Sequence, residues 1–285
     1  MIKDIYAKKR PLFSFEVFPP KKDWEFEAVY SVLDRLAALN PDFISVTYGA
    51  GGSNSKKNRE IAAYIQGNCH IEALAHLTSV GLNKEQLRET VDSLKASGVH
   101  NILALRGDRP KTMTDEQFHN RSFTYAAEMT AFLKEDPALC VAGACYPEKH
   151  FEAPDMQTDL THLKEKADAG ADFLITQLFF DNDSFYRLRE NAGKLGIHVP
   201  ISAGIMPVTS VNQLGTTVSL SGSSVPKQLS DVLAKYADSP ADMKKAGIDF
   251  AISQIEGLLS NGVDGIHIYT MNKPEISEII LKAVK

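Results

Sequence analysis

The sequence is poor in cysteine. Its 285 residues include only Cys69, Cys140 and Cys145, and no two of them form a C-x-x-C pair. An odd and scattered set of this kind predicts neither a disulfide framework nor a zinc site. We therefore expect the three cysteines to be small core residues or reduced thiols.

Basic charge and long apolar runs are also lacking. A formal net charge of -5 at pH 7 gives no basic surface for nucleic acid. No apolar run approaches the roughly 20 residues that span a bilayer. The N-terminal M-I-K-D-I-Y-A-K-K-R carries charges where a signal peptide needs an apolar core. The sequence therefore predicts a soluble cytoplasmic protein without nucleic-acid or membrane partners.

Common cofactor and metal motifs are missing as well. Gly49, Gly51 and Gly52 do not complete G-x-G-x-x-G, and G-x-x-x-x-G-K-[ST] does not occur. These absences argue against a Rossmann site or a P-loop. Neither H-x-x-H nor H-E-x-x-H is found, so no metal is predicted. If the chain binds a nucleotide, it would therefore do so without these motifs, across the mouth of the barrel that the strand and helix pattern predicts.

The chain does contain a regular alternation of strand and helix patterns. Strands are predicted within 13–20 and at 43–47, 71–77, 101–105, 140–144, 172–178, 201–205 and 265–269. Helices are predicted at 24–39, 56–66, 84–97, 125–134, 157–169, 184–195, 210–258 with a loop at 219–224, and 275–283. Eight strand-then-helix units predict one (β/α)8 TIM barrel domain over residues 1–285, with a doubly wound open sheet as the alternative.

Polar residues interrupt these apolar strands mainly at or just past their C-terminal ends. Because such ends meet on one face of a barrel, side chains distant in sequence would line one pocket, which favours a catalyst. The alternative is that strand ends are polar because they reach water, and Thr47 and Tyr269 are most easily explained in this way. The residues are Glu16, Thr47, His76, Arg106, Asp108, Tyr146, His150, Gln177, Tyr269 and Asn272.

Glu16 is the only charged residue among the strand formers of F-S-F-E-V-F-P-P. Burial of a carboxylate disfavours its charged form, so Glu16 is a candidate proton donor near neutral pH. Pro19 and Pro20 end the strand directly beyond it, which places Glu16 at the end of the strand where barrel enzymes carry their chemistry. The alternative is an edge strand with Glu16 exposed to water.

Two other segments combine a strand end with binding chemistry. In L-R-G-D-R-P, Arg106 can hold a phosphate or carboxylate, and Gly107 lets the backbone approach a flat ligand. The alternative is a surface ion pair between Arg106 and Asp108. In I-T-Q-L-F-F-D, Gln177 is either a satisfied core amide or a group that reads an amide-bearing ligand.

Eight motifs in this order resemble the bacterial methylenetetrahydrofolate reductases. Between Phe13 and Lys273 they read S-F-E-V-F-P-P, S-V-T-Y-G-A-G-G, A-H-L-T, L-R-G-D, Y-P-E-x-H, D-A-G-A-D-F-L-I-T-Q-L-F-F-D, G-I-M-P-V and H-I-Y-T-M-N. The resemblance implies a (β/α)8 barrel that holds FAD noncovalently. It also implies reduction of 5,10-methylenetetrahydrofolate to 5-methyltetrahydrofolate with NADH or NADPH, in one-carbon metabolism and methionine supply. The regulatory domain of the eukaryotic relatives is expected to be absent.

The resemblance assigns roles to individual residues. Glu16 would be the general acid that protonates the departing N10 amine as the imidazolidine ring opens to an N5 iminium. Asp108 would lower the flavin potential and favour that cation. Gln177 would contact folate and nicotinamide in turn, in ping-pong kinetics, and Met271 and Lys273 fall at folate-binding positions. The positions that match FAD-binding residues are Thr47, His76, Arg106, Gly107, Asp108, Tyr125, Ala126, Ala144, Tyr146, His150, Asp159 and Lys166.

A few positions depart from the family pattern. On the helix that carries Lys166, His162 and Glu165 replace an Asn and an Arg, which exchanges a cation near the FAD diphosphate for a carboxylate. Val211 stands where relatives place a Phe near the folate ring. Lys273 replaces an Arg, which keeps the charge but loses the planar fork of donors.

Two other functions stay open at this stage. A pterin-binding methyltransferase or synthase barrel would share a folate pocket but need no flavin. A flavoprotein subunit of a larger complex would bind FAD without oxidising NAD(P)H alone. We expect a homo-oligomer that acts on small molecules, and the choice between NADH and NADPH is left open because no Rossmann acidic signature is present.

Overall fold

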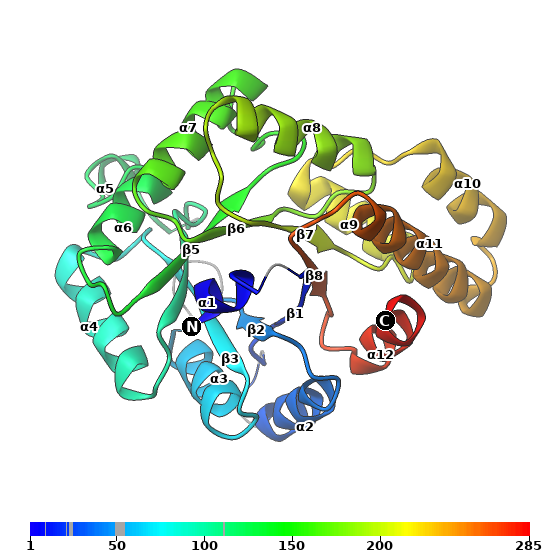
Figure 1. Cartoon of the computed structure of the whole chain (residues 1–285), viewed down its shortest axis with the longest axis horizontal. Coiled ribbons are helices and arrows are strands. Elements are labelled where there is room, and N and C mark those ends of the chain that lie inside the picture. Colours follow the sequence, from blue (N-terminus) through cyan, green and yellow to red (C-terminus); the bar gives the residue numbers. More distant parts are fainter. Residues whose placement is uncertain (9, 21, 23–24, 49–54, 111) are drawn as a thin grey trace.

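The strands form a closed ring. The computed structural model describes all residues except 9, 21, 23–24, 49–54 and 111, so Gly49, Gly51, Gly52 and the start of the helix predicted from residue 24 lie outside the described residues. The strands are β1 (Leu12–Val17), β2 (Phe43–Val46), β3 (Glu72–Thr78), β4 (Asn101–Leu105), β5 (Cys140–Cys145), β6 (Phe173–Thr176), β7 (Ile201–Ile205) and β8 (Gly265–Tyr269). They pair in parallel in this order, and β8 pairs with β1 (Figure 1). The predicted (β/α)8 barrel is therefore confirmed, and the open sheet is excluded.

Helices surround this ring, except α1, which lies across one end of it (Figure 1). They are α1 (Ile2–Tyr6), α2 (Phe26–Ala37), α3 (Ser55–Gly67), α4 (Lys84–Ala96), α5 (Asp115–His119), α6 (Ala126–Leu133), α7 (Met156–Asp168), α8 (Asn182–Lys194), α9 (Val211–Ser221), α10 (Lys227–Tyr236), α11 (Pro240–Ser260) and α12 (Pro274–Val284). Most lie within a few residues of the predicted ranges. The exceptions are α1 and α5, which the sequence does not predict, and the stretch predicted as helical at 210–258. Its predicted loop at 219–224 begins only at Gly222 because α9 runs to Ser221, and a second break at 237–239 separates α10 from α11.

The main apolar core lies between the outer faces of the strands and the helices. Alternate strand residues such as Phe15, Ile44 and Val46 point outward and pack against helix residues such as Leu33 and Ile61. This division leaves the other face of each strand for the barrel interior. No helix among the described residues is long and apolar enough to cross a membrane.

Helix α1 covers the N-terminal end of the barrel and lies at the centre of the ring in Figure 1. Its Ile2 and Tyr6 side chains pack on inward-facing strand residues such as Phe43. The Ile2 amide donates to Asn101 Oδ1 at 3.0 Å, and the Tyr6 hydroxyl lies 2.8 Å from Ser202 Oγ. The interior is therefore packed at this end, and space for a ligand is left at the other.

Helices α9, α10 and α11 occupy the long connection between β7 and β8. Their residues Leu214, Leu229 and Met243 form an apolar cluster with Val208, which follows β7. Gly247 of α11 makes this contact close, because a Cβ built there would lie 1.6 Å from the Val208 carbonyl oxygen. The glycine therefore fixes α11 against the loop that follows β7.

The three cysteines are free, as predicted. Cys140 and Cys145 are buried, and Cys69 is partly buried. Burial raises the pKa of the Cys145 thiol to about 12, so it stays protonated and behaves as a small apolar side chain.

Candidate active site

A cavity of about 740 Å³ opens at the C-terminal ends of the strands. This volume lies within the range of small-molecule and cofactor sites. Its lining comes from β1, β3 to β6, β8, α6, α7, the end of α9 and the loops that follow the strands. Most of the site residues predicted from the sequence line it: Glu16, Thr47, His76, Arg106, Gly107, Asp108, Tyr125, Ala126, Ala144, Tyr146, His150, Asp159, Lys166 and Gln177. Met271 and Lys273 follow β8, are exposed, and do not line it.

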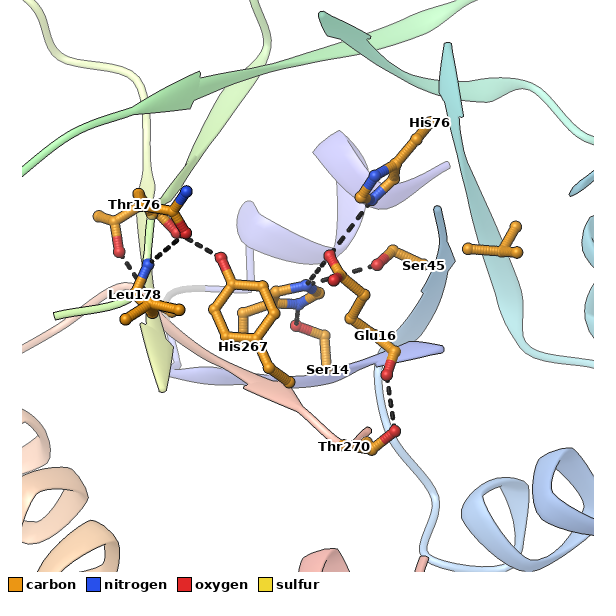
Figure 2. Close-up of polar contacts among 12 residues, drawn as sticks. Ser14, Glu16, Ser45, His76, Thr176, Leu178, His267 and Thr270 are labelled. Atoms are coloured by element: carbon orange, nitrogen blue, oxygen red, sulfur yellow. Dashed lines mark hydrogen bonds and ion pairs between the residues drawn. The ribbon is translucent and has the colours of Figure 1, made fainter. Parts of the chain in front are cut away.

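Glu16 is buried near the floor of this cavity, with 7% of its surface exposed. The alternative of an exposed edge strand is wrong, because β1 has β2 on one side and β8 on the other. Figure 2 shows the Glu16 carboxylate between two imidazole rings. Its Oε2 lies 3.5 Å from His76 Nε2 and 3.7 Å from His267 Nε2.

His267 was not predicted as a site residue. It lies on β8, is completely buried, and its Nδ1 is 2.7 Å from Ser14 Oγ. Its Nε2 is 3.4 Å from Ser45 Oγ. The strand pattern G-I-H-I-Y could have indicated it, because residues two apart share a face and Tyr269 was already a candidate.

The buried His76 side chain is neutral at pH 7. Burial lowers its pKa to about 4, although the Glu16 carboxylate acts in the opposite direction. Its Nε2 has no hydrogen-bond partner within the described residues, yet it faces Glu16 at 3.5 Å. A buried nitrogen of this kind is suited to a polar ligand group in the cavity.

The seam between β1 and β8 fixes the end of β1 just beyond Glu16. Thr270 Oγ1 donates to the Glu16 carbonyl oxygen at 2.7 Å. The Asn272 side chain accepts from the Phe18 amide and donates to the Phe18 carbonyl oxygen, each at 2.9 Å. Met271 and Asn272 both have left-handed backbone angles, with φ of 51° and 55°. Such strain in non-glycine residues is held only where the surroundings enforce it.

Arg106 forms an ion pair with Glu152 of the loop that follows β5. The carboxylate that Arg106 contacts is therefore Glu152, whereas the exposed Asp108, the partner in the predicted surface pair, lines the cavity and adds to the negative charge that raises the pKa of Arg106. Gly107 between them has φ of 82°, and a Cβ there would lie 2.7 Å from Val80 Cγ1. Only glycine fits this turn, which brings backbone to the cavity wall.

Lys166 crosses from α7 to the end of β5. Its Nζ donates to the Ala144 carbonyl oxygen, and its stem lies where a Cβ on Gly143 would be, at 2.5 Å from Lys166 Cδ. Burial lowers the pKa of Lys166 and raises that of Asp159 on the same helix. The ammonium group therefore faces the cavity from a weakly solvated position, where it attracts anions strongly.

The substituted positions on α7 pair with each other. His162 Nδ1 lies 2.9 Å from Glu165 Oε2, and the His162 ring stacks on Tyr125 with centroids 4.4 Å apart. Glu165 does not line the cavity, whereas His162 and Tyr125 do. The carboxylate that replaces a cation in the family pattern is therefore directed at His162.

Gln177 lies just past β6. Its backbone amide donates to the Cys145 carbonyl oxygen at 2.7 Å, and its side-chain oxygen accepts from the Leu178 amide at 2.9 Å. No described residue accepts a hydrogen bond from its side-chain nitrogen. An amide donor on the cavity wall is suited to read a polar ligand.

The donor set fits a dinucleotide cofactor rather than a metal. Arg106, Lys166 and His150 supply cationic or hydrogen-bonding groups for phosphates, and Leu103 and Ala104 supply apolar wall. Among the described residues, no three His, Cys, Asp or Glu side chains gather as a metal site requires.

Comparison with known sequences gives a consistent result. The family model described as methylenetetrahydrofolate reductase matches residues 1–285. The chain is 38% identical over 267 residues to the 5,10-methylenetetrahydrofolate reductase of Pectobacterium carotovorum, covering 94% of this chain and 88% of that protein. The Escherichia coli protein of the same name is 34% identical with the same coverage. The chain is 32% identical to methylenetetrahydrofolate reductase (NADH) 1 of Arabidopsis thaliana and spans 48% of its length.

Solved structures resemble the fold at low sequence identity. A Clostridium thermocellum protein that binds two copies of 5-methyl-5,6,7,8-tetrahydrofolic acid has a TM-score of 0.63 and 14% identity, covering 100% of this chain and 98% of that one. Dihydropteroate synthase from Xanthomonas albilineans has a TM-score of 0.53 and 13% identity, covering 96% and 91%. At these identities the likeness extends to the barrel alone.

Proposed function

Because this chain belongs to the methylenetetrahydrofolate reductase family, we propose that it uses FAD and NADH or NADPH to reduce 5,10-methylenetetrahydrofolate to 5-methyltetrahydrofolate. The observation that supports this most directly is Glu16, a buried carboxylate on the floor of a cavity large enough for a cofactor. The reaction needs an acid in a place shielded from water, and Glu16 is such a group.

Arg106, Lys166 and His150 would hold the FAD phosphates, with Gly107 allowing close backbone approach. Thr47, His76, Tyr125, Ala126, Ala144, Tyr146 and Asp159 would complete the cofactor site. FAD, when bound, supplies the hydride that turns the exocyclic methylene of the substrate into a methyl group, after receiving it from NAD(P)H.

Glu16 would donate its proton to N10 of the folate as the carbon–nitrogen bond to N10 breaks. The electron pair of that bond takes the proton, and the remaining carbon becomes an iminium at N5. The carboxylate that is left in the buried site is a negative charge close to this cation, which stabilises it.

Asp108 and Gln177 would act on the substrates from the cavity wall. The exposed Asp108 would add a second negative charge that favours the cationic iminium. Gln177 would donate through its side-chain amide to folate or nicotinamide, each in turn, in a ping-pong sequence. Met271 and Lys273 lie beyond the cavity lining, where they would contact the part of the folate that extends from it.

An anaerobic absorbance experiment tests this function. The purified protein is loaded with FAD, its flavin spectrum is recorded, NADH or NADPH is added, and methylenetetrahydrofolate follows. Bleaching by the nucleotide and reoxidation by the folate would establish the reductase. A flavin that neither nucleotide bleaches would favour the partner-dependent subunit, and failure to bind FAD would favour a flavin-free folate barrel.

The role of Glu16 has its own test. Glu16→Gln keeps the shape of the side chain but cannot donate the proton, so we expect folate reduction to fall by at least about 100-fold. Reduction of the flavin by NAD(P)H should change little, because that half-reaction needs no acid at this position. Equal loss of both half-reactions would contradict the assigned role.

We further propose that the protein is cytoplasmic and forms a homo-oligomer. No helix among the described residues is suited to a membrane, in agreement with a location in the cytoplasm. Light scattering coupled to size-exclusion chromatography would test the oligomer, and a mass of one chain would contradict it.

A further inference from the structure

We propose that Arg121 binds a phosphate group of a nucleotide in the cavity, either the diphosphate of FAD or the 2′-phosphate of NADPH. The inference rests on the proposed function, which supplies these two ligands. Arg121 was not predicted as a site residue. It lies in the connection between α5 and α6, and it lines the cavity together with Tyr125.

Arg121 differs in its charge balance from the other arginine that lines the cavity. The Arg106 guanidinium is paired with the Glu152 carboxylate. The Arg121 guanidinium instead bonds to backbone oxygens, and none of the described carboxylates lies within 4.0 Å of it. Its charge still acts on the loop that follows β5, because the pKa of Glu152 is lowered mainly by Arg106 and, to a smaller extent, by His150 and Arg121. Arg121 is therefore a cation of the cavity wall whose charge is available to a ligand.

The guanidinium of Arg121 is held in one place before any ligand binds. Nη1 donates to the Phe118 carbonyl oxygen, and Nη2 donates to the Thr124 carbonyl oxygen at 3.2 Å. The group also lies over the Phe118 ring, 4.0 Å from its centroid. Each terminal nitrogen carries two hydrogens, so one hydrogen on each is left for a ligand. A planar fork of this kind matches two oxygens of a phosphate.

The chain around Arg121 is fixed to the barrel as well. Phe123 is buried, and its ring packs against Phe132 of α6 with centroids 5.6 Å apart. The Thr124 amide donates to Glu128 Oε2 at 2.6 Å, at the start of α6. A cation that is already ordered loses little conformational freedom when it binds a ligand, which favours affinity.

Holding this connection and binding a phosphate make different demands on the side chain. The two bonds to backbone oxygens need donors but no net charge, whereas attraction of a phosphate needs the charge. Arg121→Gln keeps a donor and removes the charge. Arg121→Lys keeps the charge and removes the planar fork. The two variants therefore separate the two roles.

The first measurement is the quenching of FAD fluorescence as apoprotein is added. If Arg121 contacts the diphosphate, Arg121→Gln should bind FAD at least about 10-fold more weakly, as loss of one hydrogen bond to a charged group implies. Arg121→Lys should recover part of this loss. The difference between wild type and Arg121→Gln should shrink as NaCl is raised, because salt screens the attraction.

The second measurement is the calorimetric binding of ADP-ribose and of 2′-phospho-ADP-ribose to FAD-loaded protein. These unreactive probes differ only in the phosphate that distinguishes NADPH from NADH. If Arg121 contacts this phosphate, wild type should prefer 2′-phospho-ADP-ribose, and Arg121→Gln should reduce the preference by at least about 10-fold. The affinity for FAD should then be unchanged.

Arg109→Gln is the matched control, because it changes the net charge equally. The Arg109 guanidinium also lies over the Phe118 ring, at 5.5 Å, but it is paired with Asp115 and does not line the cavity. This variant should bind FAD and both probes as wild type does. The proposal is overturned if Arg121→Gln alters neither affinity more than Arg109→Gln does. It is also overturned if Arg121→Gln and Arg121→Lys lose affinity equally at every salt concentration, since the backbone bonds alone would then explain the loss.

Both measurements report binding rather than turnover, so they are independent of the test of the proposed function. If NAD(P)H fails to bleach the flavin, or folate fails to reoxidise it, the proposed function fails. The affinities would still show whether Arg121 binds a phosphate.

Discussion

Glu152→Gln should strengthen the binding of FAD to the apoprotein. The Arg106 side chain lines the cavity with 18% of its surface exposed, and its guanidinium is paired with the Glu152 carboxylate. This pair lowers the pKa of Glu152. Glu152 is held toward Arg106 by its loop, since its backbone amide donates to His150 Nδ1 at 3.1 Å. A cofactor phosphate that uses Arg106 must therefore compete with a carboxylate of the protein itself.

The size of the effect follows from the exposure of the pair. The Glu152 side chain is 45% exposed, so solvent screens much of the attraction. Ion pairs of this kind contribute up to about 1 kcal/mol, which corresponds to a change of about fivefold in a dissociation constant. We therefore expect Glu152→Gln to bind FAD up to about fivefold more tightly. The gain should shrink as NaCl is raised, because salt screens the pair that wild type must break.

Quenching of FAD fluorescence during titration of apoprotein measures the affinity. Glu135→Gln is the matched control, because Glu135 faces Arg88 at 3.7 Å in an exposed pair away from the cavity and its loss changes the net charge equally. This control should bind FAD as wild type does. If Glu152→Gln bound FAD more weakly while Glu135→Gln was unchanged, Glu152 would contribute to the cofactor site and the reasoning would be refuted.

The other predictions concern the flavin, the fold and the effect of pH. Asp108→Asn should raise the flavin midpoint potential in a spectroelectrochemical titration, and an unchanged potential would place that charge away from the ring system. Gly247→Ala should lower the free energy of unfolding by about 3 kcal/mol, because the added methyl meets the Val208 carbonyl, whereas Gly215→Ala, with open space around it, should raise it by up to about 1 kcal/mol. Urea titration measures both, and equal effects would contradict the packing argument. Burial lowers the pKa of His76 to about 4, so as pH falls from about 6.5 to about 4 the unfolded chain binds a proton at this residue and the folded chain does not. The free energy of unfolding of wild type relative to that of His76→Gln should therefore fall by about 3 kcal/mol over this range. Parallel pH profiles of the two proteins would argue against a buried neutral imidazole.

The barrel could be predicted because its signals are local. Strands such as Asn101–Leu105 and Cys140–Cys145 are short apolar runs bounded by helix patterns, and periodicity within each segment is enough to find them. Helix α1 gave no such signal. It has five residues, and it is held by bonds from Ile2 to Asn101 and from Tyr6 to Ser202, which are distant in sequence.

The sequence could predict which residues lie at the strand ends that line the site, but not which of these residues contact one another. Glu16 was found because a lone carboxylate among strand formers is conspicuous. Its neighbour His267 lies across the closing seam of the barrel, and nothing in the sequence places the two side by side. For Arg106 the sequence offered Asp108 two residues away, whereas the fold brings Glu152 from another loop. Local spacing therefore indicates which residues face the cavity, and only the closed barrel determines which of them pair.

The seam between β1 and β8 has a consequence for synthesis on the ribosome. Glu16 leaves the exit tunnel well before His267, Thr270 and Asn272, because the other strands of the barrel lie between them in the sequence. Ser14 and His267 are 253 residues apart, so Glu16 gains its buried surroundings only when β8 pairs with β1. Until then a growing chain exposes the edges of an open parallel sheet, which is prone to mispairing. The pairing of β8 with β1, which protects the nascent chain from aggregation, is thus also the step that buries Glu16.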